Sequence, residues 1–107
     1  RILENTKADL MCFGHTHKPY HRVLKGEDEA GTIYRHAINI GSVGKPKDGD
    51  PRACYAMLTI DETASRVSPD TISVGFIRVE YDVEKAAKAI EGSPLPDYYS
   101  EALRKAK

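Results

Sequence analysis

The chain has 107 residues, a length that predicts a single domain built around one core. Sixteen Lys and Arg side chains balance sixteen Asp and Glu side chains, so the net charge is zero with neutral histidines. This balance argues against nucleic acid as a partner, because a nucleic-acid-binding domain usually carries a basic excess or stripe. No apolar stretch is long enough to span a bilayer, so we expect no membrane partner and a cytoplasmic location.

Five strands are predicted after a first segment that has the pattern of a helix end. Residues 1–5 are typical of the last turn of a helix, and we therefore expect further residues upstream of this chain. The strands are predicted over residues 8–13, 20–25, 32–40, 53–60 and 71–81. The second and third should form a hairpin, and the fourth, apolar on both faces, should be internal. The apolar residues of the fifth strand change face near Gly75, so either a bulge resets the register or both faces are covered.

Two helices are predicted after the strands. Asp82 is a good N-cap for the first helix, Gly92 is a suitable end, and Glu84 can pair with Lys88 one turn along. A shorter helix is predicted over residues 97–106. Together these elements predict an α/β fold, with a mostly antiparallel sheet of about five strands followed by two C-terminal helices.

The strongest chemical signal is the tetrapeptide Gly14-His15-Thr16-His17, which directly follows the first predicted strand. If that strand continues into the turn, residues two apart project to the same side, and both imidazoles can enter one pocket. Neutral imidazole binds zinc, iron, manganese or nickel, and Gly14 supplies the freedom for a positive φ. By itself the pattern His-x-His also occurs by chance in structural roles.

A second candidate element is the segment 39–44, in which Gly41 and Gly44 flank Ser42 at the end of a strand. Such a turn can present backbone N–H groups to an anion, although a simple turn is the plainer interpretation. The next segment, 45–52, contains three cations, two aspartates, two prolines and one glycine. Cations could attract phosphate, but we favour a solvated loop over a phosphate site there. His21 and His36 are isolated in sequence, and we assign no role to either.

These motifs together resemble the calcineurin-like metallophosphoesterase superfamily, and in particular its small prokaryotic phosphodiesterase branch. The matching segments are residues 8–19 (ADLMCFGHTHKP), 39–44 (NIGSVG) and 48–56 (DGDPRACYA). Their order, spacing and strand-then-loop context are similar to those of the family. The resemblance implies a four-layer αββα sandwich, to which this chain contributes its sheet and two C-terminal helices.

The resemblance also implies a site and an activity. His15 would bind one divalent metal ion and His17 the other, and Asn39, Gly41 and Ser42 would lie on a loop that binds substrate. Manganese is the favoured metal, with iron, zinc, nickel or magnesium as alternatives. The implied reaction is hydrolysis of a phosphomonoester or phosphodiester by a dinuclear metal centre. The implied substrate is a phosphorylated small molecule or nucleotide.

Several family motifs are absent from residues 1–107, namely the Asp-x-His, the Gly-Asp with its bridging carboxylate, the Asn-His pair and a further His. Two histidines cannot hold two divalent ions with open positions for water and substrate. We therefore expect residues 1–107 to be the C-terminal part of a single metallophosphoesterase domain, inactive alone and without an assignable catalytic residue. An open sheet face should then be covered by a second copy of the chain or by a missing N-terminal segment.

Two other hypotheses remain at this point. The chain could be a non-catalytic metal- or phosphate-binding regulatory module that kept the same fold. It could also be a self-standing β-rich domain with a structural His-x-His, which would predict no exposed apolar sheet face.

Overall fold

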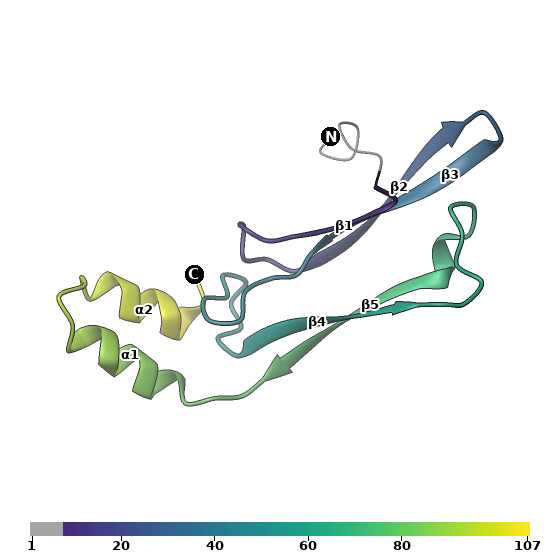
Figure 1. The fold of residues 1–107 in the computed structure, drawn as a ribbon. Helices are drawn as coiled ribbons and strands as arrows, with labels where there is room; N and C mark the ends of the chain where they lie inside the picture. Colours follow the sequence, from purple (N-terminus) through teal and green to yellow (C-terminus); the bar gives the residue numbers. More distant parts are fainter. Residues whose placement is uncertain (1–7) are drawn as a thin grey trace.

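The computed structural model describes residues 8–107, and the predicted helix end at residues 1–5 lies outside the described residues. Five strands are followed by two helices, which confirms the predicted fold class (Figure 1). The elements are β1 (Leu10–Phe13), β2 (Tyr20–Asp28), β3 (Gly31–Asn39), β4 (Ala53–Ile60), the short 3-10 helix η2 (Pro69–Thr71), β5 (Ile72–Val79), α1 (Val83–Glu91) and α2 (Tyr98–Lys105).

The first three strands form one sheet in the order β1-β3-β2, with β1 parallel and β2 antiparallel to β3. The β2–β3 hairpin is longer than predicted, because its turn is tight. The carboxylate of Asp28 accepts the N–H of Ala30 at 2.8 Å, and Gly31 has a φ of +128° that suits only glycine. The strands therefore pair from Asp28 and Gly31 onward to Tyr20 and Asn39.

The last two strands form a separate antiparallel sheet of β4 and β5. The single sheet of five strands expected from the sequence is thus divided into two, because β4 pairs with β5 alone among the described strands. The register runs without interruption from Ala53 opposite Val79 to Ile60 opposite Ile72, so no bulge lies at Gly75. The expectation that β4 is internal is also wrong for residues 8–107, since Tyr55, Leu58 and Ile60 are exposed.

The two helices pack against each other at one end of the molecule (Figure 1). Asp82 caps α1 as predicted, accepting the N–H of Lys85 at 3.0 Å, and Gly92 ends it. Glu84 does not form the expected ion pair with Lys88. It instead binds Arg104 of α2 at 2.7 Å, and Glu91 binds the same guanidinium at 2.9 Å. Hydrogen bonds from the Arg104 guanidinium therefore connect the two helices, and these bonds hold the pKa values of both glutamates below their usual range.

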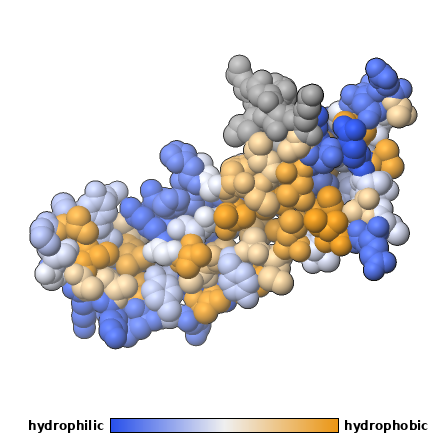
Figure 2. Space-filling model, in the orientation of Figure 1, coloured by the Kyte–Doolittle hydropathy of each residue, from blue (hydrophilic) through white to orange (hydrophobic). Residues whose placement is uncertain are grey.

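The molecule is elongated, and much apolar surface is exposed. Its radius of gyration is 17.8 Å, whereas a compact domain of this length has about 13 Å. Met57 is 55% and Ile60 58% exposed in β4, and Figure 2 shows a broad apolar area over the strands on the face drawn. The hypothesis of a self-standing domain, which required no exposed apolar sheet face, is therefore wrong. That a second copy or an N-terminal segment covers this surface stays a prediction.

A buried histidine of the three-stranded sheet contacts a half-buried one on the neighbouring strand. His36 of β3 is 2% exposed, and its Nδ1 lies 2.9 Å from Nε2 of His21 on β2, with the rings stacked. The two residues are near cross-strand neighbours, which the sequence could not reveal because 15 positions separate them. Burial and then the neighbouring His21 lower the pKa of His36 below its ordinary value.

This pair predicts that the protein loses stability in mild acid. Because the folded pKa of His36 lies below the ordinary 6.5, the unfolded chain binds more protons, and the free energy of unfolding should fall as the pH drops through that value. Urea unfolding at pH 7.5 and 5.5 measures the effect. His36→Gln, which cannot be protonated, should flatten this pH dependence, and His21→Gln should flatten it in part. An unchanged pH dependence in His36→Gln would contradict the assignment.

Candidate metal centre

Parallel pairing of β1 with β3 brings two loops to one edge of the sheet. Phe13, the last residue of β1, lies opposite Asn39, the last residue of β3. The pairing continues one step further, as the N–H of Ile40 donates to the Phe13 carbonyl at 2.9 Å. Loops that follow the carboxyl ends of parallel strands commonly form binding sites. The loops 14–19 and 40–47 therefore leave the sheet side by side. They contain four of the five predicted site residues, and the fifth, Asn39, lies directly before the second loop.

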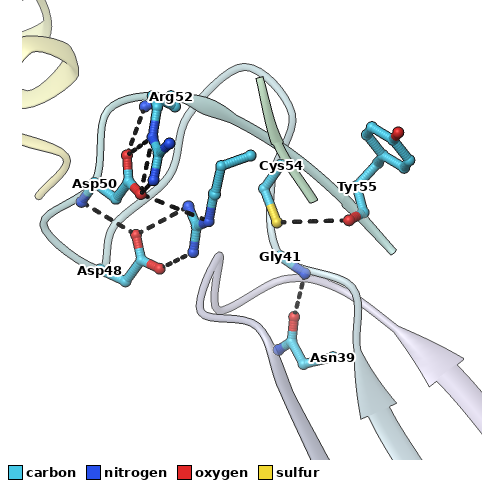
Figure 3. A network of polar contacts seen from close by, with 8 residues as sticks. Asn39, Gly41, Asp48, Asp50, Arg52, Cys54 and Tyr55 are labelled. Atoms are coloured by element: carbon cyan, nitrogen blue, oxygen red, sulfur yellow. Dashed lines mark hydrogen bonds and ion pairs between the residues drawn. The ribbon is translucent and has the colours of Figure 1, made fainter. Parts of the chain in front are cut away.

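Asn39 connects these two loops. Its side chain is 0% exposed, its Nδ2 donates to Thr16 Oγ1 at 2.6 Å, and its Oδ1 accepts the N–H of Gly41 at 2.9 Å (Figure 3 shows the second bond). A buried amide with partners at both ends resists displacement, since breaking either bond leaves a polar group unpaired. The family resemblance implies that Asn39 lies on a loop that binds substrate. In the structure its amide is occupied in holding the His15–His17 turn against the Gly41 turn.

The two candidate ligands have an uncommon backbone conformation. His15 has a φ of +85° and His17 a φ of +62°, whereas Gly14 is not in the left-handed region. The expected freedom at Gly14 is therefore not what shapes the turn. Strand β1 also ends at Phe13, so strand alternation does not orient the two imidazoles. Left-handed residues other than glycine cost about 1–2 kcal/mol each and gather at functional sites, where surrounding contacts enforce them.

The ring of His17 is fixed by the neighbouring loop. Its Nδ1 lies 2.7 Å from the backbone carbonyl of Lys45. Because a carbonyl only accepts, Nδ1 must carry the proton, and Nε2 keeps its lone pair for a metal ion. Such a second hydrogen bond is the usual way in which proteins orient a ligating histidine. Lys45 is held in turn by Ser42, whose Oγ accepts the Lys45 N–H at 2.9 Å.

Gly41 is required where it stands for two reasons. Its φ is +76°, and a Cβ built on it would lie 3.3 Å from both Cys54 Sγ and Pro19 Cβ. Cys54 is 2% exposed beneath this turn and belongs to β4. The turn is therefore in close contact with the His15–His17 loop on one side and with the second sheet on the other.

Both aspartates of the 45–52 loop form ion pairs within the molecule (Figure 3). Asp48 forms an ion pair with Arg78 of β5, and Asp50 binds Arg52 at 2.8 Å. Although burial raises the pKa of Asp48, the hydrogen bond from Arg78 lowers it below its usual value. Lys45 Nζ lies over the ring of Tyr99, 5.1 Å from the ring centre. These contacts agree with a structured loop rather than with a cluster of cations that binds phosphate.

His15 and His17 fit a metal centre as part of a ligand set. His15 is exposed, and His17 is half-buried with Nε2 available. Within residues 8–107, however, no three His, Cys, Asp or Glu side chains gather closely enough to hold an ion by themselves. Thr16 and the Lys45 carbonyl are supporting groups that the sequence did not reveal. Their partners lie 23 and 28 positions away, and no local pattern announces such contacts.

The geometry at Gly41 predicts a position-specific loss of stability. Gly41→Ala should lower the free energy of unfolding by about 1–2 kcal/mol from backbone strain alone, with the close contacts adding to it. Gly44→Ala is the matched control, because its Cβ would meet no atom within 4 Å and its φ is not positive. Urea unfolding of both variants measures the difference. Equal stabilities would contradict this account of the turn.

The Asn39–Thr16 hydrogen bond predicts coupling between two residues far apart in sequence. Thr16→Val and Asn39→Ala should each destabilise the protein, and together they should cost less than the sum of the single changes. The expected coupling is about 0.5–1.5 kcal/mol, the usual net value of such a bond. A double-mutant cycle in urea measures it, with Thr63→Val in place of Thr16→Val as the uncoupled control. Full additivity would show that the bond contributes nothing.

Comparison with known proteins identifies the family. The sequence profile of the calcineurin-like phosphoesterase superfamily domain matches residues 1–63. An uncharacterized protein of Methanocaldococcus jannaschii is 34% identical, over 90% of this chain and 39% of that protein. The crystal structure of a metallophosphoesterase from Sphaerobacter thermophilus is similar with a TM-score of 0.69 and 27% identity, over 98% of this chain and 44% of that one.

The present chain thus spans less than half the length of both relatives. The profile match covers more than half of this chain and contains the whole His15–His17 turn and the Gly41 turn. The structural match extends over both sheets and both helices. The chain therefore belongs to the calcineurin-like phosphoesterase superfamily.

Proposed function

We propose that the protein hydrolyses phosphomonoesters or phosphodiesters at a dinuclear metal centre, to which His15 and His17 each contribute one ligand. The observation that carries this proposal is the hydrogen bond from His17 Nδ1 to the Lys45 carbonyl, which leaves Nε2 free to bind a cation. Family membership and the left-handed backbone at both histidines support it. The remaining ligands would come from outside residues 8–107, where the described side chains form no complete site.

Bound metal ions would supply Lewis acidity toward phosphoryl oxygens and lower the pKa of a bound water, and manganese is the metal we favour over iron, zinc, nickel or magnesium. The chain's own residues supply positions. Asn39 fixes the distance between the two loops, and the Lys45 carbonyl fixes the tautomer of His17. No residue among 8–107 is assigned as general acid or base, and we propose that these residues do not catalyse hydrolysis by themselves.

We further propose that the Gly41–Gly44 turn contacts the substrate phosphate. Among the hydrogen bonds of residues 8–107, none uses the N–H of Ser42, Val43 or Gly44 as donor, and the last two residues are exposed. Successive free N–H groups in a turn form an anion-binding concavity. Asn39 would then act on substrate through Gly41 rather than by contact. The substrate class this supports is a phosphorylated small molecule or nucleotide.

The competing proposal is a regulatory module of the same fold that binds metal or phosphate without hydrolysing it. It uses the same two candidate ligands, His15 and His17, and the same turn at Gly41. The two proposals differ in one measurement, since a module would bind the ion and leave phosphate esters intact.

In the described part of the chain no helix has the length and apolar character needed to cross a membrane. A cytoplasmic location, and cover of the exposed strands by a second copy or an N-terminal segment, remain part of the proposal.

The proposal predicts that the two histidines are needed for both metal and activity. In the whole protein, His15→Ala and His17→Ala should each lower manganese content and reduce kcat/KM by at least about 100-fold. This loss exceeds the one expected when a residue that only hydrogen-bonds to a metal ligand is removed. Metal analysis and hydrolysis of p-nitrophenyl phosphate and bis(p-nitrophenyl) phosphate measure these effects. His21→Ala is the control, because His21 lies outside both loops.

Full metal content and full activity in both loop variants would refute the assignment. Metal binding that depends on both histidines without hydrolysis of either ester would favour the regulatory module instead.

A further inference from the structure

Two main-chain groups of the 45–52 loop form hydrogen bonds with the candidate ligand His17. The Lys45 carbonyl accepts from Nδ1 of His17 at 2.7 Å, and the N–H of Lys47 donates to the His17 carbonyl at 3.4 Å. Both ends of the histidine, ring and backbone, are therefore held by the same short segment. The orientation of the imidazole depends on where this segment lies.

Contacts with the C-terminal elements determine where the segment lies. The Lys45 ammonium lies over the ring of Tyr99 in α2, and the N–H of Gly49 donates to the carbonyl of Ala106, at the end of α2, at 3.0 Å. Asp48 forms an ion pair with Arg78 of β5. Pro46, between Lys45 and Lys47 in the chain, is fully buried at a relative exposure under 2%. Helix α2 thus lies far from the histidines in sequence but is connected to them through one loop.

We propose that the 45–52 loop positions His17 and that helix α2, through Tyr99, sets how well His17 binds metal. The inference rests on the proposed role of His17 as a ligand and adds a means by which α2 acts on it. In water both neutral tautomers of histidine are populated, and only the one with the proton on Nδ1 presents Nε2 to a metal. A carbonyl held at hydrogen-bond distance removes the competing tautomer before the metal arrives.

The loop's two lysines allow a matched test. Lys45→Gln removes the ammonium over Tyr99, whereas Lys47→Gln removes the same charge two positions away and leaves that contact in place. Tyr99→Leu removes the aromatic face, and Tyr99→Phe retains it. The two lysine variants lose the same net charge, and the two Tyr99 variants test the contact without any change of charge.

The first measurement is the tautomer of His17 in the metal-free whole protein, read from ¹⁵N chemical shifts of its ring nitrogens. We expect the wild type, Lys47→Gln and Tyr99→Phe to hold the proton on Nδ1. Lys45→Gln and Tyr99→Leu should shift His17 toward the mixed population of free histidine. The second measurement is manganese affinity, which should weaken by about two- to fivefold in these two variants, as the loss of one exposed cation–π contact allows.

Identical ring shifts and identical affinities in Lys45→Gln and Lys47→Gln would overturn the proposal, as would failure of Tyr99→Phe to restore what Tyr99→Leu loses. Amide spectra of each variant separate a local change from unfolding. His17→Ala distinguishes this failure from failure of the proposed function. If His17→Ala keeps its full manganese affinity, His17 is no ligand, whatever the ring shifts show.

Discussion

The parallel pairing of β1 with β3 is the constraint on which the candidate site depends. It places Phe13 opposite Asn39, so the loops that begin at Gly14 and Ile40 leave the sheet at the same edge. Asn39, buried at that edge, then binds the Thr16 hydroxyl and the Gly41 N–H. The bond to Gly41 is local to the turn, but without the pairing the bond to Thr16 could not form, and the two turns would have no fixed relation.

The site combines local strain with contacts that enforce it. His15 and His17 both have a left-handed backbone, a conformation that an isolated His-x-His turn would leave. The Asn39–Thr16 bond acts on the residue between them, and Lys45 and Lys47 act on His17 itself. These restraints come from two different elements, β3 and the 45–52 loop. A ligand held in this way needs little reorganisation when it binds a cation.

Local sequence signals predicted the individual elements well. Alternation and turn residues located five strands, and Asp82 and Gly92 marked the first helix, because these features depend on neighbours within a few positions. The arrangement of the strands was less accessible. The two apolar faces of β4 suggested an internal position, but an apolar pattern indicates only that a surface avoids water, not which strand covers it. Similarly, the sequence predicted an ion pair of Glu84 with Lys88. The packing of α2 on α1 instead brings Arg104 to Glu84.

The sequence by itself predicts His15 and His17 as candidate metal ligands, and it determined that Ser42 lies between two glycines directly after the third strand. These conclusions need only residue type and order. The tertiary structure alone decided what each does: that Asn39 is buried between two turns, that His17 carries its proton on Nδ1, and that Tyr99 of α2 reaches the loop beside it. The physical reason is that hydrogen-bond partners 23 to 28 residues apart are chosen by strand pairing and helix packing, which no local pattern encodes.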